Sequence, residues 1–133
     1  MARVLISSGS PWEEVVGYSR AIRVGSLVMV AGTTATDAEG RVVAPGDPYT
    51  QTKVALARVE AALTEAECSL RHVVQTRLFV TDIRSWEEVG RAHGEVFGQI
   101  RPVTTMVEVA RLIDPAMAVE VEAVAVVEAA DGR

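Results

Sequence analysis

The first part of the chain carries runs of apolar, β-branched residues separated by a turn. Residues 19–31 contain two such runs around Gly25-Ser26, and a Gly-Ser pair in this position is typical of a tight turn between antiparallel strands. Residues 3–7 form another short run of the same kind. The pattern predicts an N-terminal β-hairpin with residues 3–7 as a further strand.

The hydrophobic period changes from that of a strand to that of a helix after Asp47. Asp47 is a favourable N-cap residue, and proline at the next position suits a first helical turn. Leu56, Val59 and Leu63 then recur at helical spacing. A helix with one apolar face is therefore predicted, and the β-branched run at residues 73–80 predicts a strand after it.

A second helix and two more strands are predicted in the last third. Ser85 and Glu88 have the spacing of a capping box, which predicts a helix over 85–98. The segments 105–112 and 118–127 have the composition of strands and are separated by turn-forming residues. The order of elements is thus strands, helix, strand, helix and two strands.

The final strand alternates in a way that bears on both packing and chemistry. Glu120 and Glu122 lie on one face of it, and Val119 and Val121 lie on the other. Apolar residues nevertheless occur at both parities of several strands, and two helices on one face cannot cover them all. We therefore expect an α+β fold with a mixed β-sheet, two helices on one face and another copy of the chain on the other.

Length and charge narrow the classes of function. The chain has 133 residues, of which 49% are hydrophobic and 23% charged, so we expect a single folded domain over residues 1–133. The net charge of −5 disfavours a nucleic-acid partner. Without an apolar run near 20 residues, no membrane association is expected, and the one cysteine, Cys68, fits a buried thiol in a cytoplasmic protein.

The sequence gives no indication of a bound metal or organic cofactor. Its His, Asp and Glu residues do not cluster at metal-ligand spacing. Gly9-Ser10-Pro11 lacks the glycine spacing and the lysine of a phosphate-binding loop. We therefore expect neither a metal nor a cofactor.

Three segments resemble one known family across most of the chain. Residues 102–112 (Pro-Val-Thr-Thr-Met-Val-Glu-Val-Ala-Arg-Leu) and 119–123 (Val-Glu-Val-Glu-Ala) are similar to the signature of the Rid family, reactive intermediate deaminases formerly called YjgF proteins. Gly17-Tyr18-Ser19 resembles the Gly-Pro-Tyr-Ser motif of that family without its proline. The resemblance implies a chorismate-mutase-like fold, a homotrimer and three ligand clefts between neighbouring subunits.

The resemblance also implies a chemistry, from which this chain departs at one position. Deaminases of the family hydrolyse small enamines or imines to 2-keto acids and ammonia, and an arginine binds the substrate carboxylate. Thr104 stands at the matching position here, and a threonine hydroxyl cannot form the charged bidentate pair of a guanidinium. The positions that the resemblance assigns to the ligand cleft are then Tyr18, Ala31, Gly32, Thr104 and Glu122.

Several side chains have both a catalytic and a structural interpretation. Glu122 could orient or activate an attacking water, or form a surface or interface ion pair. Arg20 is two residues from Tyr18 on an extended segment, so it could supply the charge that Thr104 lacks, or it could be solvated or paired between subunits. His93 lies among apolar residues of the second predicted helix, which favours a structural role over acid–base chemistry.

Three classes of function remain open. The first is an imine or enamine deaminase with an altered recognition group. The second is a module that binds a small carbonyl metabolite without turning it over, for example as a sensor. The third is an endoribonuclease or translation inhibitor, which ranks last because it requires a basic face for RNA.

Overall fold

The structure, a computed structural model, describes residues 2–128 and contains one six-stranded sheet. The strands are β1 (Arg3–Ile6), β2 (Ala21–Val24), β3 (Leu27–Thr33), β4 (Val73–Val80), β5 (Val103–Glu108) and β6 (Val119–Val126). They lie in the order β1-β2-β3-β6-β4-β5, and every pair is antiparallel except β4–β5. The expected mixed sheet is confirmed.

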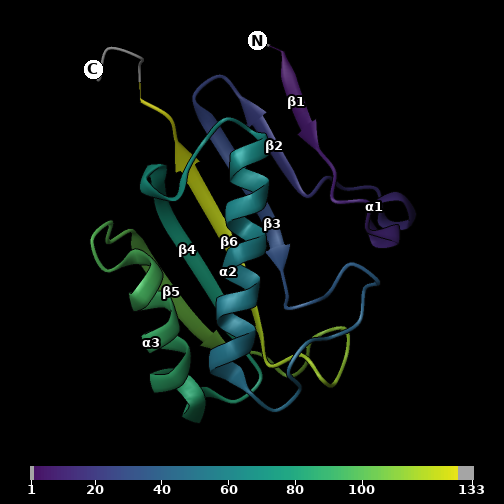
Figure 1. The fold of residues 1–133 in the computed structure, drawn as a ribbon, viewed down its shortest axis with the longest axis vertical. Coiled ribbons are helices and arrows are strands. Elements are labelled where there is room, and N and C mark those ends of the chain that lie inside the picture. Colours follow the sequence, from purple (N-terminus) through teal and green to yellow (C-terminus); the bar gives the residue numbers. More distant parts are fainter. Residues whose placement is uncertain (1, 129–133) are drawn as a thin grey trace.

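Two long helices cover one face of this sheet (Figure 1). They are α2 (Pro48–Glu65) and α3 (Trp86–Phe97). The Asp47 side chain accepts a hydrogen bond from the Thr50 amide, so α2 begins as predicted. Leu56 and Leu63 of α2 are buried in the hydrophobic core between the helices and the sheet. Within residues 2–128, no helix is both long and apolar enough to cross a membrane.

A short third helix, α1 (Pro11–Val16), was not predicted. Ser10 caps it, and Gly17 ends it with a left-handed backbone (φ 90°) that glycine adopts without strain. The one buried side chain of α1 is a carboxylate, Glu13. Hydrophobic periodicity could not reveal this helix because its anchor is polar.

In the last third, α3 begins directly after Ser85 as predicted, but the predicted capping bond of Ser85 and one strand boundary were wrong. The Ser85 side chain does not cap α3; its hydroxyl donates to the Asp82 carbonyl oxygen at 2.7 Å, because residues 83–85 form a separate 3₁₀ turn. The strand expected to reach residue 112 ends at Glu108. Its partner β4 ends at Val80, which is paired with Glu108, so the ladder has no further residues to extend it.

The opposite face of the sheet has no helix over it in the described part of the chain (Figure 1). The strand register places alternate residues of all six strands on this face, which we call the open sheet face. Several large apolar side chains there are at least 40% exposed: Leu5, Leu27, Met29, Val103, Val107 and Val126. The apolar strand residues that two helices on one face cannot cover thus lie together on the open sheet face.

One buried side chain, Gln51 of α2, fixes two loops that approach the helix N-terminus. Its amide nitrogen lies 3.1, 3.2 and 2.9 Å from the carbonyl oxygens of Val43, Ala44 and Ala116. Its amide oxygen accepts a hydrogen bond from the Ala118 N–H at 2.7 Å. Gln51 therefore satisfies backbone groups of the loops that precede α2 and β6.

Replacing Gln51 by leucine should destabilise the protein. The apolar side chain would leave several partly buried backbone groups without partners, and we expect a loss of about 2–4 kcal/mol in the free energy of unfolding. Urea denaturation measures it, with Gln99→Leu in the exposed turn after α3 as the control. A loss within about 0.5 kcal/mol, the usual effect of a surface substitution, would mean that other contacts hold these loops.

Candidate functional site

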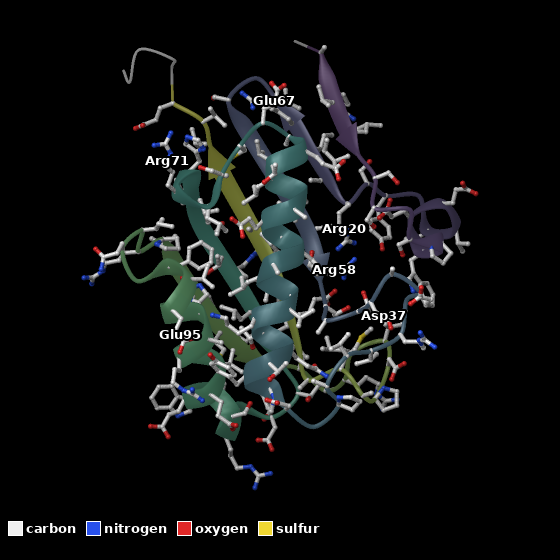
Figure 2. The ribbon with its side chains drawn as sticks, viewed as in Figure 1. Arg20, Asp37, Arg58, Glu67, Arg71 and Glu95 are labelled. Atoms are coloured by element: carbon white, nitrogen blue, oxygen red, sulfur yellow. The ribbon has the colours of Figure 1, made fainter. Side chains whose placement is uncertain are left out.

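A cleft of about 820 Å³ lies beside the end of β3. Its walls are α1, the loop after β3, the segment before β6 and one side chain of α2. The predicted residues Tyr18, Arg20 and Gly32 line it, together with Arg58 and Glu120. Figure 2 shows the labelled Arg20 and Arg58 side chains near each other between α2 and α1. We call this space the arginine cleft.

Arg20 is almost wholly buried, with 6% of its surface exposed. Its Nη1 donates to the carbonyl oxygen of Gly32 and to the hydroxyl of Thr33, both at 2.8 Å. Its Nη2 donates to the Tyr18 hydroxyl at 3.3 Å, and the guanidinium carbon lies 5.5 Å from the centre of the Tyr18 ring. The side chain predicted to bind a ligand therefore also holds the end of β3 and Tyr18 in position.

Glu13 of α1 is the acidic neighbour of Arg20. Its Oε2 lies 3.7 Å from Arg20 Nε, which is buried and without a hydrogen-bond partner among the described residues. Burial alone would raise the pKa of Glu13, but hydrogen bonds from Ser8 and Ser7 and the charge of Arg20 together hold this pKa below its ordinary value. Glu13 thus stays ionised and attaches α1 to Arg20.

Glu120 approaches the cleft at a position where glycine leaves room for it. A Cβ atom on Gly32 would lie 2.6 Å from Glu120 Oε2, so only glycine permits this packing without a shift of the carboxylate. Burial raises the pKa of Glu120, the charge of Glu122 raises it further, and the charge of Arg20 partly opposes both. This carboxyl group is therefore suited to carry a proton at higher pH than an ordinary glutamate.

Arg58 brings a second guanidinium into the cleft from α2. It is partly buried, and burial followed by the nearby charge of Arg20 lowers its pKa. Arg58 Nη1 donates to the Thr34 carbonyl oxygen at 2.7 Å, the one acceptor it has in the described part of the chain. Because a guanidinium has five N–H donors, most of those on Arg58 remain available.

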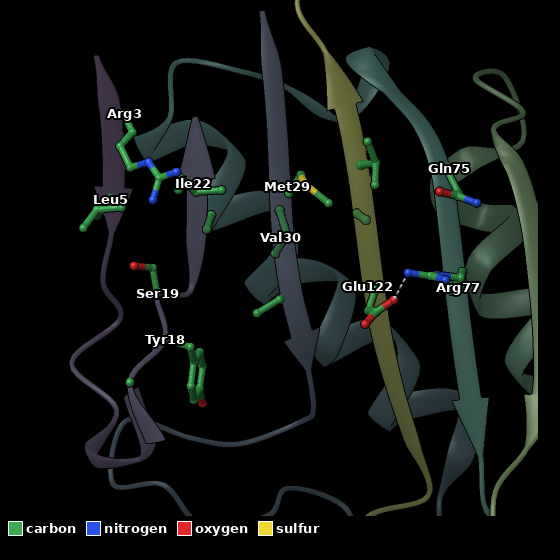
Figure 3. Close-up of a pocket in the computed structure, with 15 residues that line it drawn as sticks. Arg3, Leu5, Tyr18, Ser19, Ile22, Met29, Val30, Gln75, Arg77 and Glu122 are labelled. Atoms are coloured by element: carbon green, nitrogen blue, oxygen red, sulfur yellow. Dashed lines mark ion pairs between the residues drawn. The ribbon is translucent and has the colours of Figure 1, made fainter. Parts of the chain in front are cut away.

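Glu122 and Ala31 line a different hollow, a cavity of about 440 Å³ on the open sheet face. Figure 3 shows Glu122 beside Arg77, with Tyr18 on the other side of the cavity. Arg77 Nη2 lies 2.9 Å from Glu122 Oε1 without hydrogen-bond geometry, which makes the contact an ion pair. Tyr18 lines both hollows, so it lies between Glu122 and the arginine cleft.

Thr104 lies away from both hollows, on the edge strand β5. Its hydroxyl is 2.8 Å from that of Thr76, whose oxygen is also 2.8 Å from His93 Nε2 of α3. The His93 ring packs on Phe97 at 4.7 Å between centroids, and burial lowers the pKa of His93. Within one chain, Thr104 therefore belongs to a chain of hydrogen bonds between the sheet and α3.

Sequence reasoning did not identify Glu120 or Arg58 as site residues. The alternation in β6 put both glutamates on one face but could not show which of them packs against Gly32. Arg58 was one charged position on an amphipathic helix, indistinguishable from a solvated side chain. Its only signal was proximity in space to Arg20, which is 38 positions away in the sequence. Within residues 2–128, no group of three or more His, Cys, Asp or Glu side chains is placed to hold a metal ion.

Comparison with known proteins points to one family. The family model described as endoribonuclease L-PSP matches residues 9–127. The crystal structure of Rv2704 from Mycobacterium tuberculosis, described as a member of the highly conserved YjgF/YER057c/UK114 family, superposes with a TM-score of 0.87. The two sequences are 52% identical, and the match covers 95% of this chain and 100% of that one.

Two relatives extend the comparison to other organisms. An uncharacterized protein of Streptomyces coelicolor is 44% identical over 88% of this chain and 87% of its own length. The 3-aminoacrylate deaminase RutC of Acinetobacter baylyi is 27% identical over 92% of this chain and 95% of its own length.

The raised pKa of Glu120 predicts how stability depends on pH. A carboxyl group with a raised folded-state pKa contributes full stability below its unfolded value, near 4.5, and loses that contribution as the pH rises through the folded value. Glu120→Gln stays neutral at both pH values. The melting temperature of the variant minus that of the parent should therefore be larger at pH 8 than at pH 4.5. Thermal unfolding measures this difference.

Glu60→Gln, on the exposed side of α2, is the matched control for this experiment. Glu60 lines neither hollow, so the same gain at pH 8 is not expected. If Glu120→Gln gained nothing at pH 8, burial would not be penalising the ionised form of Glu120.

Proposed function

The chain belongs to the Rid (YjgF) family, whose model is described as endoribonuclease L-PSP, and we propose that it binds a small imine or enamine carboxylate and hydrolyses it to a 2-keto acid and ammonia. The observation that carries the proposal is the Glu120 carboxyl group. It is partly buried against Gly32, has a raised pKa and lines the same cleft as Arg20 and Arg58. Perturbed carboxyl groups in clefts are typical of acid–base catalysts.

Each step of the proposed reaction has a group to perform it. Protonated Glu120 donates its proton to the imine nitrogen, or to the β-carbon of an enamine, which makes the adjacent carbon electrophilic. The Glu120 carboxylate then accepts a proton from the water that attacks this carbon. Glu120 then gives this proton to the carbinolamine nitrogen and accepts the hydroxyl proton as the C–N bond breaks, which expels ammonia, leaves the 2-keto acid and restores protonated Glu120. The atoms balance as one imine plus one water giving one keto acid plus one ammonia.

The other residues of the arginine cleft supply binding and orientation. Positive charge from Arg20 and Arg58 compensates the substrate carboxylate. Tyr18, held by Arg20, offers its hydroxyl as a hydrogen-bond donor or acceptor near the reacting carbon. The RutC relative from Acinetobacter baylyi, named a 3-aminoacrylate deaminase, supports this reaction class.

Binding without turnover is the second candidate. Thr104 cannot clamp a carboxylate as an arginine does, and its hydroxyl is already engaged with Thr76. The cleft would then bind an anionic carbonyl metabolite without catalysing any reaction of it. The family model's description names an endoribonuclease, but the net charge of −5 disfavours an RNA substrate.

We further propose that the chain assembles as a homotrimer through the open sheet face, with the remaining predicted positions completing the site across the interface. The support is the exposed apolar surface that includes Leu5, Met29 and Val103. In this arrangement Ala31 and Glu122 lie on the covered face, and Thr104 of one subunit approaches the cleft of its neighbour.

Ammonia release from freshly generated 2-iminopropanoate should exceed the rate in buffer alone. Glu120→Gln should lower this rate by about 100-fold or more, because it removes the proton carrier. A coupled glutamate dehydrogenase assay measures the release, and Glu122→Gln is the matched control because Glu122 is paired with Arg77 instead.

Each result of the assay has a separate meaning. If Glu122→Gln alone abolished release, the catalytic role would pass to Glu122, as the sequence suggests. If the parent protein released no ammonia above buffer while still binding 2-keto acids, the function would be binding and the deaminase proposal would be wrong.

Met29→Glu should prevent assembly, because it places a charge in the apolar surface of the open sheet face. Met29 is 46% exposed on β3. Size-exclusion chromatography with light scattering should show a trimer for the parent and a monomer for the variant. Val15→Glu on α1, where Val15 is 83% exposed, adds the same charge away from this face and should stay trimeric. A monomeric parent would contradict the assembly.

A further inference from the structure

Of the two guanidinium groups in the arginine cleft, Arg58 is the one available to a ligand. Arg20 is 6% exposed and gives three of its five N–H donors to Gly32, Thr33 and Tyr18. Its free Nε is buried and lies toward Glu13. Arg58 is less buried and donates to Thr34 at 2.7 Å, which leaves donors to face the cleft.

The charges around these two groups leave room for one anion. Glu13 is the carboxylate adjacent to Arg20, and it already accepts hydrogen bonds from Ser7 and Ser8. Glu120 faces the same cleft, and burial raises its pKa. With Glu120 protonated, two arginine charges are balanced by one carboxylate. A single ligand carboxylate between Arg58 and Arg20 would restore neutrality and relieve the repulsion between them.

The size of the cleft exceeds that of the smallest imino acids. A six-heavy-atom acid occupies about 180 Å³ at roughly 30 Å³ per atom, the share of one water in the liquid. The cleft measures about 820 Å³, within the range of pockets that hold larger ligands. A three-carbon acid would therefore leave most of the space to water.

Part of the cleft wall is apolar and is not buried in the core. Trp12 and Val16 of α1 and Ile113 of the segment before β6 are 50%, 66% and 68% exposed, and all three line the cleft. Leu112 and Met117 continue the same wall. Large apolar side chains exposed around a concave site are typical of a surface that binds an apolar group.

We infer that Arg58 binds the ligand carboxylate directly, with Arg20 as a buried supporting charge, and that the ligand is a 2-imino acid with a bulky, branched apolar side chain packed against Trp12 and Ile113. This inference rests on the proposed function for the reaction. The preference for a bulky, branched side chain concerns ligand binding alone. With the ligand carboxylate on Arg58 and the ligand side chain on the apolar wall, the reacting carbon of the ligand lies between the two. Arg58 performs the recognition that the family resemblance assigned to the position of Thr104.

The test is a binding measurement with stable 2-keto acids in place of the imines. In a Trp86→Phe background, the fluorescence of Trp12 reports occupancy of the cleft, because Trp12 and Trp86 are the two tryptophans of the chain. We expect 4-methyl-2-oxopentanoate to bind at least about tenfold more tightly than pyruvate, since each buried methylene contributes roughly 0.8 kcal/mol. The neutral ketone 4-methyl-2-pentanone should bind weakly because it lacks the carboxylate.

Two variants separate the contributions of charge and apolar contact. Arg58→Gln should weaken both keto acids by about tenfold or more, whereas Arg71→Gln, on the exposed 3₁₀ turn before β4, should change neither. Ile113→Ser should weaken 4-methyl-2-oxopentanoate and leave pyruvate unchanged. Light scattering on each variant checks that assembly is retained; a change of assembly with Ile113→Ser would assign this wall to a subunit contact and overturn the inference.

The outcomes also separate this inference from the proposed reaction. Equal or tighter binding of pyruvate, or no effect of Arg58→Gln, would overturn the inference even if ammonia is released from imines. The expected selectivity without any ammonia release would uphold the inference and contradict the deaminase.

Discussion

The buried guanidinium of Arg20 is the interaction on which the site depends. It joins the end of β3, through Gly32 and Thr33, to Tyr18 and to Glu13 of α1. A buried charge is costly unless its donors are satisfied, so these partners are held in one arrangement. Because α1 buries no apolar side chain, its position relies on the carboxylate that faces Arg20. The same residue therefore shapes one wall of the cleft and supplies part of its positive charge.

A local irregularity in the sheet explains why two neighbouring glutamates differ. Val30 pairs with Ala123 and Thr33 with Val121, so Ala31 and Gly32 together oppose Glu122, and the register shifts between these pairs. The missing side chain of Gly32 admits the Glu120 carboxylate, and the burial that follows raises its pKa. Glu122, two residues on, lies opposite the bulge on its β3 side and pairs with Arg77 on its β4 side. A shift of one residue in β3 thus divides an alternating strand into a cleft carboxylate and an ion-paired one.

The sequence predicted the elements whose signals are local and left out those that depend on tertiary contacts. The strand at 73–80 and the helix that starts after Asp47 were correct, because alternation and capping chemistry are written in adjacent residues. The helix α1 was missed because its anchor is Glu13, and the end of β5 was misplaced because it depends on the length of β4. In the site, Tyr18, Arg20 and Gly32 do line one cleft, whereas Glu120 and Arg58 required the register of β6 and the packing of α2.

The arginine cleft has its second positive charge on α2, at Arg58, and none at residue 104. A threonine at residue 104 on the edge strand β5 can offer one neutral hydrogen bond, and that hydroxyl is already shared with Thr76. Arg58 projects from α2, which is fixed by buried Leu56, Val59 and Leu63, so its charge rests on a rigid element beside Arg20. Two arginines this close raise each other's electrostatic energy; Glu13 offsets part of that cost, and a bound anion would offset more of it. The repulsion between Arg20 and Arg58 therefore contributes to the affinity of the cleft for a carboxylate.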